Sequence, residues 1–298
     1  MRGHIEIRAI VNNVLIPSLG ARPVVAISYA ELRGFRNARI DAPRMRGGKT
    51  IVRADGSRSI ARVNRELAVL RAVLNHAVEL RLIDRNPMNA GRGKALIVPQ
   101  AEQPRDRVLS VAEERALLAA YDGNESIRRS RDFVVALIDT GLRCGEALAV
   151  EARDIDLSAH VIRLRWETTK SKRARAVPIS ARVQVILARR MATTADGRVF
   201  GDLTYTVARN DFRVAKTKAE ISDLRLHDLR TTFATRLLMR GLTERAIAGL
   251  TGHSVGARDG LSAVLSKHYL HPLSDGGAFD AVRASLDSIA EEVATQVN

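Results

Sequence analysis

The stretch LHDLRTTFATRL, residues 226–237, combines the start of a predicted helix with two side chains capable of chemistry. We predict this helix over 228–239, and His227 and Arg230 lie three residues apart where it begins. Side chains with this separation share one face of a helix. The pair is therefore either a solvated helix end or half of a site that holds an anion and moves a proton.

Other polar side chains also lie where predicted elements end. In TGLRCGEAL, Arg143 lies between two predicted helices. In LTGHS, His253 follows a helix stop, and in SKHYLHP, Tyr269 precedes the helix breaker Pro272. Active-site residues gather at such positions, because loop ends converge while the interiors of elements pack.

Residues 160–180 are predicted to form a strand pair. Apolar and charged side chains alternate along the first strand, with Leu164 and Trp166 on the same side. The polar TKSKR segment is then the turn. It places Lys170 at the tip, with Lys172 as the alternative two residues further along.

Each of these side chains alone has an ordinary explanation, such as a helix-end ion pair, a solvated turn or a cap. Together they supply one chemistry. Two arginines can bind the non-bridging oxygens of a phosphodiester, histidine and lysine can move protons, and tyrosine can form a covalent phosphotyrosine link. Cys144, beside Arg143, is either a thiol nucleophile or a small buried helix residue, and we favour the second.

In this order the motifs resemble those of the tyrosine recombinase family, which includes phage integrases and Xer-type recombinases. HDLRTTFAT is similar to the family's H-x-L-R-H-T-F-A-T, and residues 60–88 resemble the last helix of its core-binding domain. Thr231 stands where the family often has His, and His253 and Tyr269 are 16 residues apart, where many members have about nine. The catalytic residues that the resemblance implies are Arg143, Lys170, His227, Arg230, His253 and Tyr269.

The resemblance implies a reaction that requires no metal or nucleotide cofactor. Arg143 and Arg230 would neutralise the scissile phosphate while Tyr269 attacks it, which leaves a 3′-phosphotyrosine link. Glu146, which follows Arg143 by three residues, either orients that arginine or forms a structural ion pair.

Proton transfer must accompany this attack, because a free tyrosine with a pKa of about 10 is ionised only about once in a thousand at pH 7. The resemblance assigns the base to His227 and the general acid that protonates the departing 5′-hydroxyl to Lys170. His253 would hydrogen-bond the phosphate or steady the tyrosine.

The composition favours a polyanionic partner. The chain of 298 residues has a formal net charge of +15, and residues 1–105 hold 19 Lys and Arg against 8 Asp and Glu. Aromatic residues make up only 4%, which argues against base-stacking readers of single strands. The single cysteine excludes an internal disulfide, and we find no zinc-ligand spacing and no apolar run of about 18 residues.

Two domains are predicted. A segment rich in Pro and Gly, 91–107, is the predicted linker. It separates a helical, SAM-like core-binding domain, 1–90, from an α+β catalytic domain, 108–298, so that the fold is mainly α with a small β-sheet. The other helices of the second domain are predicted at 111–121, 130–140, 144–151, 181–191, 204–219, 243–250 and 279–295.

Two of the predicted helices have surfaces with a functional interpretation. The helix within 59–83 has an apolar face and a basic face, and we predict that Arg62, Arg65 and Arg71 contact DNA phosphates. The last helix has an apolar stripe that either packs on its own domain or, as in the family, docks on a neighbouring protomer. The stripe comprises Phe279, Val282, Leu286, Ile289 and Val293.

The expected protein is thus a cytoplasmic site-specific integrase that acts on double-stranded DNA at att-like sites. It would work as a tetramer joined through the C-terminal tail, with an accessory DNA-bending or directionality factor as a further candidate partner and no membrane association. Type IB topoisomerases and catalytically impaired DNA-binding relatives are the alternatives. The arm-binding domain of many integrases is expected to be absent or removed, because the core-binding resemblance begins within the first residues.

Overall fold

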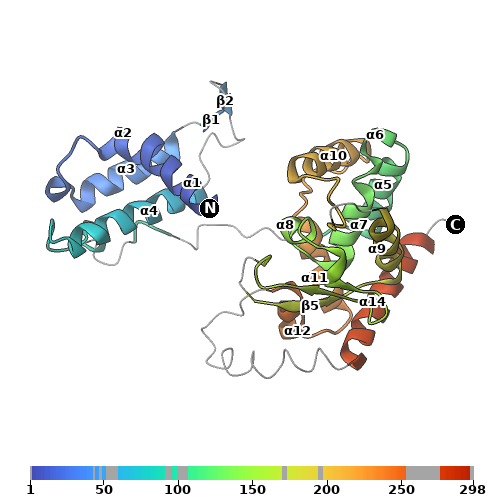
Figure 1. Cartoon of the computed structure of the whole chain (residues 1–298). Helices are drawn as coiled ribbons and strands as arrows, with labels where there is room; N and C mark the ends of the chain where they lie inside the picture. The colour runs from blue at the N-terminus through green and yellow to red at the C-terminus, as the bar shows by residue number, and fades with distance from the viewer. Residues whose placement is uncertain are drawn as a thin grey trace. The chain divides into compact units, whose positions relative to one another are not determined.

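The computed structural model describes residues 2–42, 44–46, 49–51, 60–90, 95–98, 107–169, 173–193, 197–252 and 276–295. The chain divides into two compact units, Met1–Arg105 and Asp106–Asn298, shown in Figure 1. Both are mainly helical, and the second also contains a three-stranded sheet. The predicted fold class, mainly α with a small β-sheet, is confirmed.

The first unit is organised around helix α4, Ile60–Glu79. Its predicted apolar stripe is buried against α3, Tyr29–Asp41, and against the N-terminal helices. The stripe consists of Val63, Leu67, Leu70, Leu74 and Ala77. The other elements of this unit are α1 (Arg2–Ile10), the π-helical segment η1 (Val11–Leu15), α2 (Ile16–Leu19), the 3-10 turns η2 (Val24–Ala26) and η3 (Pro87–Asn89), and the antiparallel strands β1 (Arg44–Arg46) and β2 (Lys49–Ile51).

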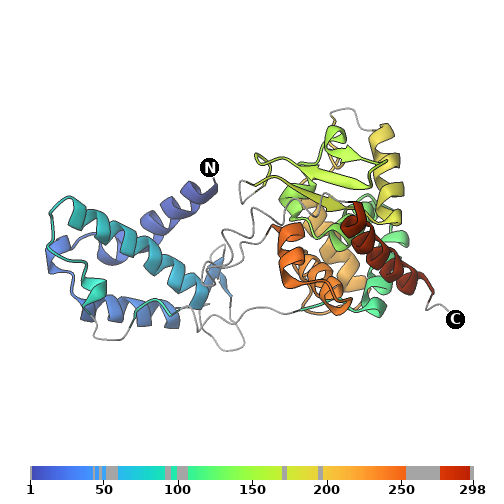
Figure 2. The ribbon, with the colours of Figure 1, turned by 90° about the horizontal axis from the view of Figure 1, so that it is seen from below.

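The second unit is built around α7, Arg131–Thr140, in which every residue from Phe133 to Thr140 is buried. Helices α5, α8, α9 and α11 pack against it, as Figures 1 and 2 show. The helical elements that the structure describes in this unit are α5 (Val111–Asp122), α6 (Glu125–Arg128), α7, α8 (Cys144–Ala147), the 3-10 turn η5 (Ala152–Asp154), α9 (Ala181–Thr193), α10 (Tyr205–Lys218), α11 (Asp228–Met239), α12 (Glu244–Thr251) and α14 (Gly276–Thr295).

The sheet of the second unit is antiparallel in the order β3 (Ile155–Asp156), β4 (Val161–Leu164) and β5 (Arg175–Pro178). This confirms the predicted strand pair, but the placement of Trp166 on the strand is wrong. Strand β4 ends at Leu164, and Trp166 is 53% exposed in the turn that follows. The backbone N–H and hydroxyl of Thr168 both donate to the Arg165 carbonyl, at 3.2 and 2.9 Å, which closes this turn.

Helix α14 lies along its own unit, against α5, α9, α11 and β5 (Figure 1). Four of the predicted stripe residues are buried there: Val282, Leu286, Ile289 and Val293. The side chain of the fifth, Phe279, lies outside the described residues. Of the two interpretations of this stripe, packing on its own domain describes the structure.

Helix α5 offers a local test of how the chain starts its helices. Ser110 accepts a hydrogen bond from the Glu113 backbone N–H at 3.1 Å, and the Glu113 carboxylate accepts from the Ser110 backbone N–H at 2.9 Å. We expect Ser110→Ala to destabilise the second unit by about 1 kcal/mol in urea unfolding, because a helix N–H loses its acceptor. The exposed Ser222, which is not an N-cap, provides the control Ser222→Ala, and equal losses for both variants would contradict the capping role.

Candidate active site

The site begins at the turn between α7 and α8, where the backbone must come close to α11. Gly141 ends α7 with a φ of +60°, in the left-handed region. A Cβ at this position would lie 2.3 Å from the ring of Phe233 on α11. Glycine therefore satisfies both the turn and the close approach of α11.

Arg230 lies in the first turn of α11 and points back to this turn. It is 3% exposed, and its Nη1 donates to the Gly141 carbonyl at 2.7 Å, while its Nη2 donates to the Thr251 carbonyl. Its Nε is buried and has no hydrogen-bond partner among the residues that the structure describes. Burial, together with repulsion from Arg143 and Arg175, lowers the pKa of Arg230 to about 9, although Glu146 opposes this shift. The guanidinium group is therefore still charged at neutral pH.

Arg143 is the N-cap residue of α8, and a buried glutamate holds it. Its Nη1 donates to Glu146 Oε1 at 2.9 Å, and its backbone N–H donates to Glu146 Oε2 at 2.9 Å. The side chain of Arg143 is 24% exposed, whereas that of Glu146 is 2% exposed. Glu146 therefore fixes Arg143 from the protein side, and the guanidinium group remains accessible to a ligand. This ion pair is required by both interpretations of Glu146, an orienting role and a structural ion pair.

A third arginine, Arg175 on β5, shares the same carboxylate. Its Nη2 and Nη1 donate to Glu146 Oε2 and Oε1 at 2.6 and 3.3 Å, and its Nε donates to the Leu250 carbonyl at 2.8 Å. Burial opposes ionisation of Glu146, but hydrogen bonds from Arg175 and from Arg143 hold its pKa below the ordinary value. Our sequence analysis missed Arg175. The sequence feature that could have identified Arg175 is the strand alternation, which places it on the same side of β5 as the buried Val177.

The three arginines meet at the C-terminal end of α12. The carbonyls of Leu250, Thr251 and Gly252 accept hydrogen bonds from Arg175, Arg230 and Arg143 in turn, the last at 3.3 Å. The end of a helix leaves such carbonyls without intrahelical partners, and cations stabilise it. We call these three carbonyls and three guanidinium groups the arginine clasp.

The clasp also requires a glycine. Gly252 has a φ of +65°, and a Cβ there would lie 3.0 Å from Nη1 of Arg175. Gly252 immediately precedes His253, so the clasp fixes the backbone from which the rest of the predicted site continues.

The structure brings together Arg143 and Arg230, which the sequence analysis predicted from motifs 87 residues apart. His227 is the exposed N-cap residue of α11, the helix that carries Arg230 in its first turn. The remaining predicted residues, Lys170, its alternative Lys172, His253 and Tyr269, lie outside the described residues.

Cys144 follows Arg143 but has the character of a structural residue. Burial raises the pKa of its thiol to about 11, so the thiolate is scarce at neutral pH. This supports our preference for a small buried residue over a thiol nucleophile. Among the described residues, no group of three or more His, Cys, Asp or Glu side chains could hold a metal ion.

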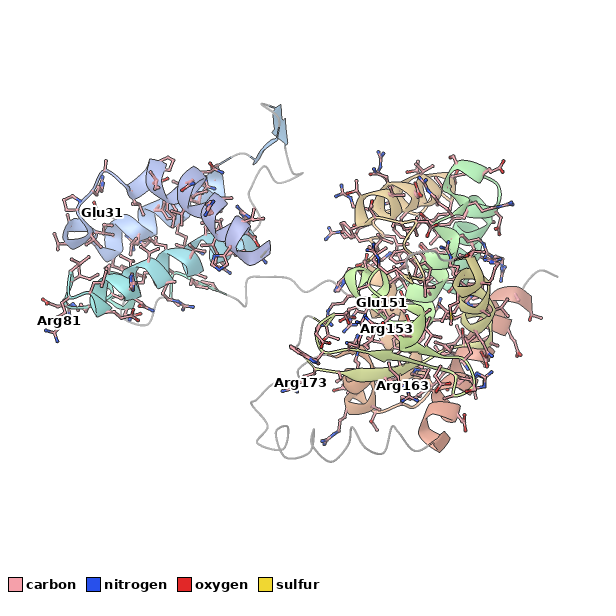
Figure 3. All side chains as sticks on the ribbon, in the orientation of Figure 1. Glu31, Arg81, Glu151, Arg153, Arg163 and Arg173 are labelled. Carbon is pink, nitrogen blue, oxygen red and sulfur yellow. The ribbon has the colours of Figure 1, made fainter. Side chains whose placement is uncertain are left out.

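The predicted DNA-contacting arginines lie on α4 of the first unit. Arg62 and Arg65 form ion pairs with Glu6 on α1, at 3.5 and 3.0 Å, and Arg62 also pairs with the buried Glu66 at 3.1 Å. Arg71 is exposed. Part of the basic face of α4 is therefore neutralised within its own unit. On the second unit, Arg163 and Arg173 lie on the β4–β5 hairpin (Figure 3).

No helix in the described parts of the chain is long and apolar enough to cross a membrane.

The comparisons agree with the motifs. Residues 107–258 match the phage integrase family. A shufflon-specific DNA recombinase of Escherichia coli is 32% identical over 237 residues, which cover 79% of this chain and 57% of that protein. A tyrosine recombinase XerC of Pelobacter propionicus is 29% identical over 206 residues, which cover 64% of each chain. The chain thus spans 57% and 64% of the lengths of these two relatives.

Among solved structures, a lambda integrase dimer bound to a COC′ core site has the same fold. Its TM-score is 0.65 at 17% identity, over 85% of this chain and 88% of that chain. The family match covers more than half of the sequence and contains Arg143, Glu146, Arg175 and Arg230. The chain belongs to the phage integrase family, the tyrosine recombinases.

Proposed function

We propose that this chain is a site-specific DNA recombinase that cleaves and rejoins duplex DNA through a 3′-phosphotyrosine intermediate. The observation that carries the proposal is the excess of positive charge at the arginine clasp. Arg143 and Arg175 share one carboxylate, and the nearby Arg230 adds a third positive charge whose buried Nε has no partner in the described parts of the chain. A buried cation cluster of this kind is costly unless an anion completes it, and a DNA phosphate is an anion of suitable geometry.

In the proposed reaction, Arg143 and Arg230 bind the non-bridging oxygens of the scissile phosphate and stabilise the charge that develops during attack. Tyr269 attacks phosphorus and displaces the 5′-hydroxyl, so one P–O bond forms as another breaks. His227 is the candidate base for the tyrosine proton, and Lys170 supplies the proton to the 5′ oxygen. A 5′-hydroxyl from a second duplex then reverses the step and exchanges strands.

His253 is proposed to hydrogen-bond the same phosphate or to steady Tyr269. Its position in the sequence, one residue beyond the arginine clasp, supports a place at this site. No metal or nucleotide is needed in this scheme, because the arginines supply the electrophilic groups and the tyrosine supplies the nucleophile.

The proposed partner is double-stranded DNA at att-like sites. The predicted core-binding domain, 1–90, would contact DNA through basic residues such as Arg71, and the predicted linker, 91–107, would join it to the catalytic domain, 108–298. Recombination between two duplexes calls for a tetramer on DNA. Docking of α14 on a neighbouring protomer would require its exchange between subunits, because its stripe is already buried in its own unit.

The test is a search for a covalent adduct. Nicked suicide duplexes tiled across the DNA that flanks the chain's own gene are incubated with the protein, which is then denatured and resolved by electrophoresis. We expect a denaturant-stable protein–DNA adduct with the wild-type chain and none with Tyr269→Phe. Tyr205→Phe, on the exposed start of α10, is the matched control and should leave the adduct unchanged.

Each contrary result identifies a different alternative. An adduct that persists in Tyr269→Phe would rule out this nucleophile. Relaxed circles without recombinant joints, from a supercoiled plasmid carrying two sites, would indicate a type IB topoisomerase. Binding without any adduct would indicate a catalytically impaired DNA-binding relative.

A further inference from the structure

Arg175 is a charged residue in an unusual place. It occupies an inward position of β5, and its side chain is 4% exposed. A strand of this kind normally buries an apolar side chain there, and burying a charge costs free energy unless good hydrogen bonds compensate. Arg175 makes three of them, to both oxygens of Glu146 and to the Leu250 carbonyl.

These bonds connect two parts of the site that are distant in sequence. Through Glu146, Arg175 reaches the group that holds Arg143 in place. Through Leu250, it reaches the end of α12, where Arg143 and Arg230 also donate. In the described residues, Arg175 is thus a common partner of the acid that orients one phosphate-binding arginine and of the helix end that both of them touch.

The sharing of Glu146 has a consequence for Arg143. Arg175 binds both carboxylate oxygens, at 2.6 and 3.3 Å, so Arg143 makes a single side-chain bond to Oε1 rather than a two-pronged ion pair. The rest of the Arg143 guanidinium is left for weaker contact with the Gly252 carbonyl at 3.3 Å. A ligand phosphate can displace such a contact more readily than a bidentate carboxylate.

We propose that Arg175 is a positioning residue of the strand-cleavage reaction, which holds the Glu146 carboxylate and the α12 terminus so that Arg143 is presented to the phosphate. This inference rests on the proposed function, because it assigns Arg143 to the phosphate. Arg175 acts through Glu146 and the helix end and is not itself a catalytic residue.

The proposal predicts a pH dependence with a definite sign. The described charged groups that face Glu146 are Arg143 beside it, Arg175 on β5 and Arg230 on α11. Removal of Arg175 takes away the largest favourable contribution, so the pKa of Glu146 should rise. Glu146 then becomes neutral as the pH falls and releases Arg143, so any loss of activity should deepen toward acid pH.

The experiment compares Arg175→Met and Arg175→Lys with the wild-type full chain between pH 5.5 and 8.5. Single-turnover adduct formation on the suicide duplex and DNA affinity are measured at each pH. We expect Arg175→Met to slow adduct formation about tenfold or more at pH 7.5, with a larger deficit at pH 5.5 and affinity within about twofold. Arg175→Lys keeps the charge but loses the planar guanidinium that binds both carboxylate oxygens, so it should recover part of the rate.

The matched control is Arg182→Met. Arg182 is also a largely buried arginine shared by two acids, Asp139 and Glu114, but it does not touch the clasp. Arg182→Met should lower the melting temperature without changing the shape of the pH profile of adduct formation. If Arg175→Met and Arg182→Met give parallel profiles, Arg175 has only a structural role and the proposal is overturned.

Two further measurements keep the test decisive. Glu146→Gln leaves Arg175 in place and mimics the neutral carboxyl, so it should be slow at every pH in this range. The carboxyl carbon of Glu146, followed by NMR, should titrate at higher pH in Arg175→Lys than in the wild type, and an unchanged titration would refute the proposal. Absence of an adduct in the wild type would instead refute the proposed function, while the NMR titration would still test the role of Arg175.

Discussion

Replacement of Arg230 with methionine is expected to slow covalent adduct formation by about 10²–10³-fold or more, without loss of the folded state. The side chain is buried and donates to the Gly141 turn and to the end of α12 in the arginine clasp. Loss of one preorganised donor to a developing charge typically reduces the rate by this factor. The measurement is the single-turnover rate on the suicide duplex at saturating protein.

The same substitution should leave the melting temperature unchanged or raise it. Arg230 is desolvated, two other arginines repel it, and no described residue is a partner of its Nε. An apolar side chain of similar length removes this desolvation and repulsion, which should offset the loss of the two hydrogen bonds to the Gly141 and Thr251 carbonyls. Activity and stability would then move in opposite directions, as at sites where function requires a destabilised arrangement.

Arg230→Lys adds a test of charge. Burial and the neighbouring arginines that lower the pKa of Arg230 would also act on a lysine, whose ordinary pKa of about 10.4 is already lower. The variant should therefore lose the cation as the pH rises above neutrality, and its rate should fall relative to the wild type. Arg240→Met, at the other end of α11, serves as the control and should stay within about twofold. Similar losses in Arg230→Met and Arg240→Met would argue against a specific phosphate site.

The largest effect on stability is expected at Glu114 on α5. Its side chain is fully buried and accepts from Arg182 at 2.8 Å and from Arg236 at 2.5 Å. Glu114→Ala leaves both arginines without this partner. Because breaking a buried ion pair costs about 3–5 kcal/mol, the second unit should unfold at markedly lower urea concentration.

A surface ion pair supplies the comparison for Glu114. Glu292 pairs with Arg240 at 2.6 Å, but its side chain is 52% exposed. Glu292→Ala should cost no more than about 1 kcal/mol, because water replaces the partner. If Glu114→Ala and Glu292→Ala lowered the free energy of unfolding equally, the buried ion pairs of Glu114 would contribute no more to stability than a surface pair.

The sequence predicted well those features that neighbouring residues determine. The helix start at Ser110 depends on capping, and the stripe on α4 depends on helical spacing within a few turns. Motif order identified Arg143 and Arg230, which the structure brings to one site. Roles for Lys170, His253 and Tyr269 stay predictions.

What the sequence analysis missed depends on partners far along the chain. The predicted helix over 144–151 stops at Ala147, because the backbone near Val150 bonds instead to residues 197–199. Arg175 finds Glu146 across 29 residues and Leu250 across 75. Local periodicity carries no information about such contacts, although an arginine at an inward strand position signals that a buried acid must lie nearby.

The arginine clasp also bears on how the chain tolerates changes in length. The sequence between Gly252 and α14 can vary in length, whereas the segments that form the clasp cannot. Gly252 is held by its carbonyl, and α14 is held by its buried stripe, so both ends of the intervening sequence are fixed independently. The entropy of closing a connection grows only slowly with its length. The 16-residue spacing from His253 to Tyr269 can thus differ from that of relatives without disturbing the arginines. The sequence between His253 and Tyr269 could therefore be exchanged for one of another length while the anion-binding framework stays constant, provided that Tyr269 still reaches the phosphate.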